Sequence, residues 1–421
     1  MKEKRRTYFC IDMKSFYASV ECAERGLNPF ETNLVVADQT RGTNALCLAI
    51  SPKLKSLGVR NRCRLSEIPN NIKYLVAMPR MKKYIEYNGD IYEIYRKYID
   101  KEDIHTYSID EVFMDATDYL PVHHKTPKEF AKFLINEVAQ KTHIPATAGI
   151  GTNLYLAKIA LDITAKKSPD HIGYLDEELF QKTLWNHRPI TDFWGIAAGT
   201  AKRLSDIAIY DMQGIAKCPT DLLYKRFGIN AELLIDHAWG RESCTIQDIK
   251  AYKSKSKSIS SSQILFRDYS KKEAAVVMSE MTLAGCQRML SKHVITNGIS
   301  IYVGYSKDLI APTKGSIRMT ETTNVYSIIH KYVERLYEET TNPDIPIRRL
   351  GISFNNIMDE GCEGYDLFTD FGKIEREKKL EHTVLDIKDK FGKNAMLRAI
   401  DLEDCATQRT RNTYIGGHNS E

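Results

Sequence analysis

Short apolar runs alternate with longer amphipathic stretches through the first 167 residues of the chain. Short apolar runs are typical of buried strands, and apolar positions three or four residues apart are typical of helices that cover a sheet. Strands that alternate with helices predict an α/β or α+β layer built around one sheet. We expect strands at 8–12, 34–37, 45–50, 74–77, 105–116 (two halves) and 147–151, and helices at 16–25, 52–57, 81–98, 127–141 and 154–167.

The pattern changes twice beyond residue 167. Residues 172–240 have the pattern of short helices separated by turn residues. Residues 250–262 are polar and aperiodic, which is typical of a linker. A second α+β domain and a charged tail helix follow, with strands expected at 261–267, 298–305 and 348–354 and helices at 273–292, 325–339 and 373–391.

The composition indicates a soluble enzyme or binding protein of several domains. The chain has 421 residues, of which 43% are hydrophobic and 27% are charged. No run approaches the roughly 20 apolar residues that a membrane span requires, and the basic residues 1–6 lead directly into a strand without a signal-peptide core. We therefore expect a cytoplasmic protein. The nine cysteines include no C-x-x-C pair, which argues against a disulfide framework and a structural zinc site.

Positive charge is concentrated in one part of the chain. Residues 241–358 carry 17 Lys and Arg against 11 Asp and Glu, whereas the net charge of the whole chain is +5. A basic module on a near-neutral body favours a polyanionic partner. A basic surface that is merely solvated remains the alternative.

Three acidic residues interrupt apolar runs. Asp12 ends the first expected strand, and Asp110 and Glu111 separate the two halves of 105–116. A buried carboxylate costs several kcal/mol unless it is paired or bound to a metal. If the hairpin at 110–111 lies beside the first strand, three carboxylates converge, and hard divalent cations relieve their repulsion. The alternative is that Asp12 caps the next helix and the acidic pair forms an exposed turn.

Neighbouring motifs favour the first interpretation. The chain contains IDMKSFYASVE at 11–21, SIDE at 108–111, TAGIG at 147–151, LAKIA at 156–160, FWGI at 193–196 and KSISS at 257–261. In this order and spacing they resemble the Y-family (lesion-bypass) DNA polymerases, UmuC/DinB-like, over residues 7–358. The tail resembles the UmuC-like polymerases of Gram-positive bacteria more than the DinB-like branch.

The resemblance implies an α+β multidomain, right-hand polymerase. A helical thumb would carry a helix-hairpin-helix, and the basic module would be an α+β little finger. The expected domains are palm at 1–28 and 76–167, fingers at 29–75, thumb at 168–241, linker at 242–258, little finger at 259–358 and C-terminal tail at 359–421.

The resemblance also implies the residues of the active site. Asp12, Asp110 and Glu111, with the backbone carbonyl of Met13, match the ligands of two Mg²⁺ ions. Tyr17 falls at the steric gate that excludes a 2′-hydroxyl; packing of this ring into the core is the alternative.

Two lysines match triphosphate-binding positions. Lys55 and Pro52 stand where the family commonly has Arg and Tyr, so a point charge replaces a bidentate fork. Lys166 is our choice for the palm lysine, although the helix after Lys158 is one residue longer before its lysine than in most relatives. Lysines that are merely solvated would have the same pattern.

DNA contacts are expected in the thumb and the basic module. Gly195 would let the thumb hairpin approach a phosphate, and the helix after Thr200 would offer its N-terminal amides, although Ala197 replaces the glycine that is usual in the family. Basic residues on alternating strand positions can follow a duplex backbone without reading its sequence. They are Lys253, Lys255, Lys257, Arg267, Lys314, Arg318, Arg348 and Arg349.

The tail segment GYDLF at 364–368 resembles the pentapeptide that docks bacterial polymerases on the sliding clamp. Leu367 and Phe368 would be its apolar anchors. Packing of the tail on its own domain is the alternative.

The sequence therefore predicts a DNA-directed DNA polymerase of low fidelity that works in SOS-type translesion synthesis. Its partners would be primer–template DNA, deoxynucleoside triphosphates and the sliding clamp, with no membrane, and its core would be monomeric. A catalytically silent DNA-binding accessory factor of the same fold is the alternative. A nucleotide cyclase is disfavoured by Tyr17, by the hairpin near Gly195 and by the basic module.

Overall fold

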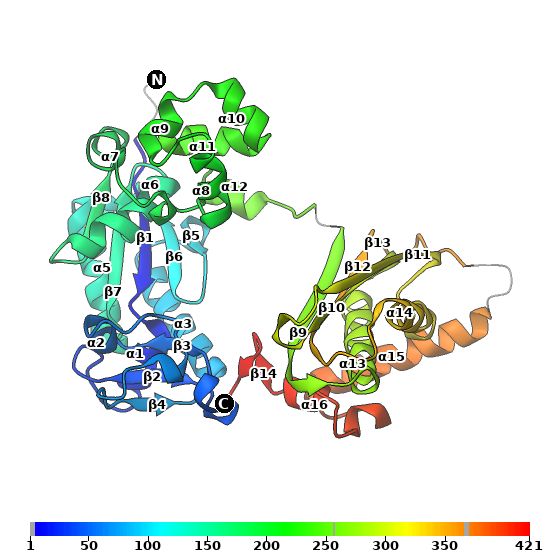
Figure 1. The fold of residues 1–421 in the computed structure, drawn as a ribbon. Helices are drawn as coiled ribbons and strands as arrows, with labels where there is room; N and C mark the ends of the chain where they lie inside the picture. The colour runs from blue at the N-terminus through cyan, green and yellow to red at the C-terminus, as the bar shows by residue number, and fades with distance from the viewer. Residues whose placement is uncertain (1–4, 256, 366–369) are drawn as a thin grey trace. The chain divides into compact units, whose positions relative to one another are not determined.

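A computed structural model describes residues 5–255, 257–365 and 370–421, and the chain divides into two units (Figure 1). The first unit comprises Met1–Lys253 with His418–Glu421, and the second comprises Ser254–Gly417. Each unit has its own five-stranded sheet and its own buried core. In the described residues, no helix is long and apolar enough to cross a membrane.

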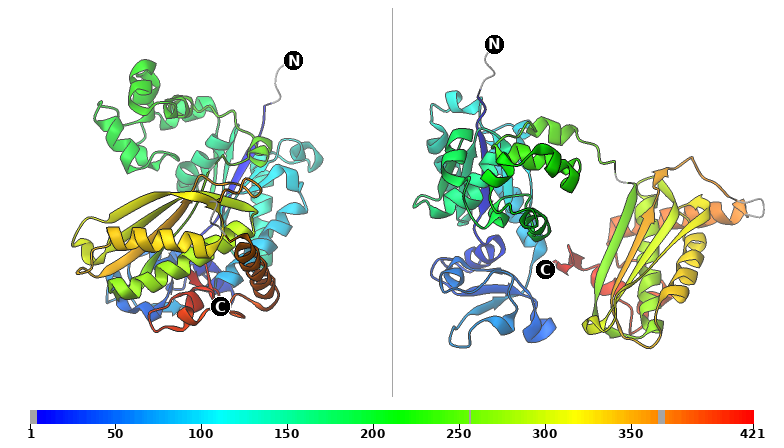
Figure 2. Two further views of the ribbon diagram at one scale, coloured as in Figure 1. Left: turned by 90° about the vertical axis from the view of Figure 1, so that its right-hand side faces the viewer. Right: turned by 45° about the horizontal axis from the view of Figure 1, so that its top comes forward.

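The larger sheet of the first unit has the strand order β5–β6–β1–β7–β8. β1 runs antiparallel to its neighbours β6 and β7, whereas β8 runs parallel to β7. The sheet places the first strand of the chain at its centre, as Figures 1 and 2 show. Its strands are β1 (Tyr8–Met13), β5 (Ile104–Thr106), β6 (Glu111–Asp115), β7 (Ala146–Gly151) and β8 (Ile172–Leu175).

We expected only helices in residues 172–240, but this prediction is wrong at β8. The sheet therefore continues past residue 167, where we expected the palm to end. The strand has only four residues, one of them a glycine, so its apolar pattern was too short to recognise. Gly173 is needed because a Cβ there would lie 2.4 Å from the carbonyl oxygen of Ala160.

The two faces of this sheet are covered by different helices. Side chains alternate along a strand, so Phe9 and Ile11 of β1 pack on one face, whereas Tyr8 and Cys10 pack on the other. The first face is covered by α3 (Met81–Arg96) and α5 (Pro127–Thr142), and the second by α6 (Leu154–Ile159). Two shorter helices are α1 (Phe16–Ala23) and α4 (Tyr119–Val122).

The residues expected to form one α-helix at 154–167 are helical throughout, but the type of helix changes along them. After α6, residues Ala160–Thr164 form a π-helical turn and Ala165–Lys167 a 3₁₀ turn. A π turn accommodates one extra residue in a helix, which agrees with the additional residue that the sequence has before its lysine.

A three-stranded sheet of order β3–β2–β4 forms a small lobe at 29–77. Its members are β2 (Leu34–Ala37), β3 (Cys47–Ile50), β4 (Leu75–Ala77) and α2 (Pro52–Ser56). The side chain of Ser51 caps α2 by accepting a hydrogen bond from the amide of Leu54. All four elements were expected.

The remainder of the first unit is helical. It contains α7 (Glu177–Leu184), α8 (Ala198–Ser205), α9 (Met212–Lys217), α10 (Thr220–Phe227), α11 (Asn230–Ala238) and α12 (Ile246–Ala251).

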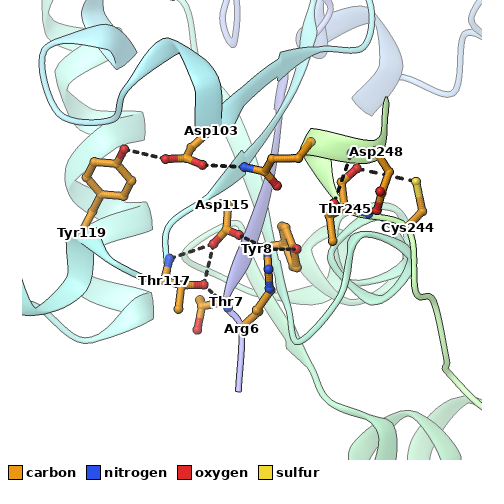
Figure 3. A network of polar contacts seen from close by, with 11 residues as sticks. Arg6, Thr7, Tyr8, Asp103, Asp115, Thr117, Tyr119, Cys244, Thr245 and Asp248 are labelled. Carbon is orange, nitrogen blue, oxygen red and sulfur yellow. Dashed lines mark hydrogen bonds and ion pairs between the residues drawn. The ribbon is translucent and has the colours of Figure 1, made fainter. Parts of the chain in front are cut away.

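Helix α12 lies within residues 242–258, which we expected to be a linker. Ile246 is fully buried beside Tyr8 and Phe113, and the amide of Gln247 donates to Asp103 at 2.9 Å. Figure 3 shows this network, in which Asp103 also accepts from Tyr119. The chain is therefore anchored to the sheet of the first unit as far as α12.

The second unit has a sheet of order β11–β10–β12–β9, and β13 also pairs with β10. The strands are β9 (Ser258–Tyr269), β10 (Val294–Tyr305), β11 (Thr313–Thr323), β12 (Ile347–Asn355) and β13 (Met358–Asp359). β9 begins at Ser258, earlier than the strand that we expected at 261–267, and so includes part of the polar stretch 250–262 that has the pattern of a linker. The helices are α13 (Lys271–Leu290), α14 (Tyr326–Thr340) and α15 (Phe371–Phe391).

Helices α13 and α14 cover one face of this sheet, where Ile301, Val303, Leu350 and Ile352 are buried. Figure 1 shows the helices on that side. The side chains at the intervening positions of these strands lie on the other face of the sheet. The short elements at the end of the chain are α16 (Gln408–Arg411), β14 (Tyr414–Ile415) and β15 (His418–Asn419).

Candidate active site

The pairing of β1 with β6 brings the acidic residues together. Asp12 is the register partner of Glu111, and residues directly opposite one another point to the same face of a sheet. The amide of Met13 donates to the carbonyl oxygen of Asp110 at 2.9 Å, which closes the hairpin beside β1. The hydroxyl of Ser108 donates to the carboxylate of Asp110 at 2.7 Å.

The three carboxylates repel one another. Burial, reinforced by the charges of Asp110 and Glu111, raises the pKa of Asp12 from 3.8 to about 7. Asp12 therefore lies within electrostatic reach of both Asp110 and Glu111. Such a cluster attracts cations.

Hard divalent cations suit this oxygen-rich donor set, but one member is engaged elsewhere. Both carboxylate oxygens of Glu111 contact the ammonium of Lys158, at 2.8 and 2.9 Å, and the thiol of Cys10 donates to the same group at 3.0 Å. In the described residues, no three His, Cys, Asp or Glu side chains converge closely enough to hold a metal ion as they stand. The donor chemistry fits a divalent cation, provided that Glu111 turns away from Lys158.

Sequence reasoning missed Lys158 and its second partner, Asp162, which lies 3.2 Å from the ammonium. Lys158 is on the α6 face that packs against the sheet, and only 8% of it is exposed. A signal was available, because a lone lysine within the apolar run LYLAKIA requires a buried negative partner. The identity of that partner depends on the strand register.

Lys14 and Lys55 lie within electrostatic reach of the acidic cluster, and Lys166 lies close to Lys55. Loss of hydration, together with the nearby charge of Lys166, lowers the pKa of Lys55, while Asp12 and Asp110 oppose the shift. Loss of hydration and the charge of Lys55 also lower the pKa of Lys14. Lys55 therefore lies within electrostatic reach of Asp12, Asp110 and Lys166, which was also chosen from sequence. Lys14 was not chosen from sequence.

Tyr17 lies on α1 next to this cluster. Its ring stacks on Tyr84, with centroids 4.5 Å apart and planes 18° from parallel. The hydroxyl of Tyr84 donates a hydrogen bond to the carboxylate of Glu21 at 2.8 Å, which fixes the position of the Tyr84 ring. Burial and the charge of Asp110 raise the pKa of Tyr17. The ring is thus held rigidly and half-buried at the edge of the site.

The hairpin at Gly195 has a positive backbone φ angle, which glycine adopts readily. Gly195 has φ +89°, and nothing lies within 4 Å of the position of a Cβ. Helix α8 begins at Ala198, two residues before Thr200, and no side chain caps its first turn. The N-terminal amides of α8 are therefore available to an external acceptor.

The cations expected to contact DNA in the basic module fall into three sets. Lys314 and Arg349 both lie over the ring of Tyr302, at 5.9 and 5.4 Å, and Arg318 is two rows away along β11. Arg267 instead pairs with Glu273 at 2.6 Å, and Arg348 faces Asp268 at 3.7 Å. These last two arginines lie where the β9–β12 register shifts, which turns their side chains toward acidic neighbours. Lys253, Lys255 and Lys257 are exposed before β9.

A row of four serines crosses the same face of the sheet. The strand register aligns Ser260 with Ser353, Ser353 with Ser300, and Ser300 with Ser316. The hydroxyls of Ser300 and Ser316 are 2.8 Å apart. A hollow of about 400 Å³ lies over this row and the next, which contains Gly351, Tyr302 and Lys314. The face therefore has a floor of hydroxyls beside a tyrosine flanked by two cations.

The clamp-binding anchors inferred from sequence, Leu367 and Phe368, lie outside the described residues. The preceding residues dock on the second unit, because Gly364 pairs with Thr322 and the hydroxyl of Tyr365 contacts Thr323 at 3.1 Å.

Comparisons with known proteins agree with this geometry. Residues 11–162 match the model of the impB/mucB/samB family, and residues 256–367 match that of the impB/mucB/samB family C-terminal domain. Among curated proteins of Bacillus subtilis (strain 168), the chain is 32% identical to UvrX, whose name associates it with UV-damage repair, over 99% of this chain and 98% of that protein. It is also 32% identical to DNA polymerase IV 2 of the same organism, over 99% of each chain.

Among solved structures, the fold is similar to that of a Y-family DNA polymerase chimera of Dbh and Dpo4. The TM-score is 0.63 at 20% identity, and the match covers 84% of this chain and all of the other. At that identity the likeness concerns the fold, which agrees with the architecture expected from sequence.

Proposed function

The chain belongs to the impB/mucB/samB family, and on that premise we propose that it is a DNA-directed DNA polymerase of the Y-family, translesion class. The observation that carries the proposal is the acidic cluster of Asp12 on β1, Glu111 opposite it on β6, and Asp110 in the bend that leads into β6. Full-length similarity to DNA polymerase IV 2 and to UvrX supports the same activity in DNA damage tolerance.

We propose that Asp12, Asp110, Glu111 and the carbonyl of Met13 hold two Mg²⁺ ions. Such ions lower the pKa of a primer 3′-hydroxyl and neutralise the charge that develops on the leaving pyrophosphate. The protein contributes the fixed positions of the donors, because Asp12 and Glu111 are opposed on β1 and β6. The hairpin is held to β1 by the hydrogen bond from Met13 to Asp110.

Lys14, Lys55 and Lys166 would bind the triphosphate. The charge of Lys55 acts on Lys14 and is itself opposed by that of Lys166, so a polyanion that entered between the lysines would relieve their repulsion. Lysine offers point charges and not a bidentate fork. The grip on the nucleotide would therefore depend on all three cations together.

Tyr17 would select deoxyribonucleotides. A ring that is stacked on Tyr84 cannot move aside without losing that contact, so a 2′-hydroxyl above it would meet a fixed surface.

DNA would be held without reading its sequence. The free amides of α8 would bind a backbone phosphate. On the second unit, Lys314, Arg318 and Arg349 flank a hydroxyl-lined floor that offers donors to a sugar–phosphate strand. The small lobe at 29–77 leaves little protein to close over a nascent pair, which would permit damaged templates and lower the fidelity. An SOS-type role and docking on a sliding clamp through Leu367 and Phe368 belong to the same proposal.

A catalytically silent DNA-binding factor of the same fold is the second candidate. It is favoured by the engagement of Glu111 with Lys158. Extension of a primer with Mg²⁺ on undamaged and abasic templates separates the two candidates. The proposal requires extension by the natural chain and none by Asp110→Ala; absence of extension by both proteins, with DNA still bound, would favour the silent factor.

A further inference from the structure

Glu111 is held by a complete set of neighbours within the protein. The ammonium of Lys158 contacts both of its oxygens, and the thiol of Cys10 donates to one of them. Only 9% of Glu111 and 8% of Lys158 are exposed to solvent. The two charges therefore satisfy each other in a place that water reaches poorly.

A second acidic residue also contacts Lys158. A carboxylate oxygen of Asp162 lies 3.2 Å from the ammonium. Lys158 therefore lies between two carboxylates, directly beside the acidic cluster.

The backbone of Lys158 is fixed in place, because α6 packs closely against β7. A Cβ at Gly149 would lie 2.1 Å from the carbonyl oxygen of Ala157, and one at Gly151 would lie 2.2 Å from the amide nitrogen of Ala157. The helix therefore approaches the strand as closely as backbone atoms allow, and Lys158 is the next residue. A rearrangement of the ion pair therefore requires side-chain movement and not a shift of the helix.

We propose that Lys158 is a stand-in cation that holds Glu111 in the metal-free chain and competes with a divalent cation for its carboxylate. This inference rests on the proposed function, in which Glu111 is a metal ligand. Lys158 is then a positioning residue that sets how strongly the acidic cluster binds metal, and the chain remains stable when no metal is present.

The test is Mn²⁺ binding to the full chain, followed by electron paramagnetic resonance without nucleotide or DNA. Lys158→Met keeps the length of the side chain and removes the competitor, so Mn²⁺ should bind about tenfold more tightly. Lys158→Arg can engage the carboxylate with two parallel hydrogen bonds, so Mn²⁺ should bind more weakly than to the natural chain.

Thermal unfolding supplies the second readout. In chelator, Lys158→Met leaves Glu111 buried without a cation and should unfold at a lower temperature, and Mn²⁺ should restore much of the loss. Lys141→Met is the matched control, because Lys141 pairs with Glu137 on the exposed side of α5; it should leave Mn²⁺ affinity unchanged. If Lys158→Met does not fold, the comparison of Lys158→Arg with the natural chain still decides.

Unchanged or weaker Mn²⁺ binding by Lys158→Met, or unchanged or tighter binding by Lys158→Arg, would overturn the inference. Its failure is distinguishable from failure of the proposed function. If Mn²⁺ binds equally to the natural chain and to Asp12→Asn, the metal site itself is refuted. If Asp12→Asn abolishes binding while the Lys158 variants behave like the natural chain, only the role of Lys158 is lost.

Discussion

Replacement of Asp12 by Asn removes one charge from the acidic cluster and should stabilise the metal-free protein at alkaline pH. The pKa of Asp12 is raised from 3.8 to about 7 in the fold. An acid whose pKa is higher in the folded state destabilises that state when it ionises. The penalty is absent below the unfolded pKa, grows as pH rises between the two values, and is complete above the folded pKa.

The size of the penalty follows from the shift. Each pKa unit corresponds to 1.36 kcal/mol, so a shift of about three units gives a penalty of ~4 kcal/mol at pH 8 and ~2 kcal/mol at pH 5. The amide of Asn does not titrate. The advantage of Asp12→Asn over the natural chain in unfolding free energy should therefore increase by about 2–3 kcal/mol as the pH rises from 5 to 8.

Urea unfolding in chelator, followed by tryptophan fluorescence, measures this difference. The chain has three tryptophans, Trp185, Trp194 and Trp239, and all of them belong to the first unit. The signal therefore reports the unit that contains the acidic cluster and is silent about the other. Saturating Mg²⁺ should remove the advantage of the variant, because a bound cation would relieve the repulsion in the natural chain.

Asp176→Asn is a control of opposite sign. Asp176 accepts a hydrogen bond from the amide of Leu179 at 2.8 Å and pairs with Arg5, and these contacts lower its pKa. Its ionised form stabilises the fold above the unfolded pKa, and the benefit is lost as pH falls through the folded pKa. Asn caps a helix about as well as Asp, so the variant should lose only the contribution of the charge, about 0.5 kcal/mol at pH 8 and less in acid. If Asp12→Asn gave no gain at pH 8, or a gain equal at both pH values, the reasoning about the cluster would be refuted.

Four further outcomes can be measured. Lys14→Ala should raise the KM for deoxynucleotides about tenfold, equivalent to ~1.4 kcal/mol, with a smaller change in kcat; an unchanged KM would remove Lys14 from the triphosphate site. Tyr17→Ala should admit ribonucleotides in primer extension and lose about 1 kcal/mol of stability with its aromatic contact; continued exclusion of ribonucleotides would contradict the steric gate. Arg349→Ala should weaken DNA binding and reduce the salt slope by about 1, and an unchanged slope would exclude a phosphate contact. A double alanine variant at Leu367 and Phe368 should lose stimulation of synthesis by the clamp but keep its basal rate, and retention of full stimulation would end the docking idea.

The central part of the fold could be predicted because its signals are local. Asp12 ends a run of buried residues, and the acidic pair splits an apolar stretch, so the pattern alone places Asp12 on β1 and the acidic pair at the start of β6. β11 was missed because its polar and apolar positions are interspersed with threonines on both faces. Such a strand has little contrast between its faces, and only its neighbours in the sheet define it.

The polar partners of the site could not be predicted for a different reason. The contact of Lys158 with Glu111 depends on the register of β1 with β6 and on how closely α6 approaches β7. The side-chain directions of Arg267 and Arg348 depend on a register shift between β9 and β12. Strand register and bulges are decided by tertiary packing, so a composition of basic residues does not fix which of them share a face.

The serine floor of the second unit has a consequence for movement along a template. Ser258, Ser260 and Ser262 occupy alternate positions of β9 and recur about every 7 Å on one face, and each small hydroxyl can serve as donor or acceptor. A sugar–phosphate strand that advanced by one nucleotide would exchange one set of such contacts for a similar one. The free-energy profile for translocation would then be shallow, and neither the base sequence nor an altered base would create a preferred stopping place on this surface.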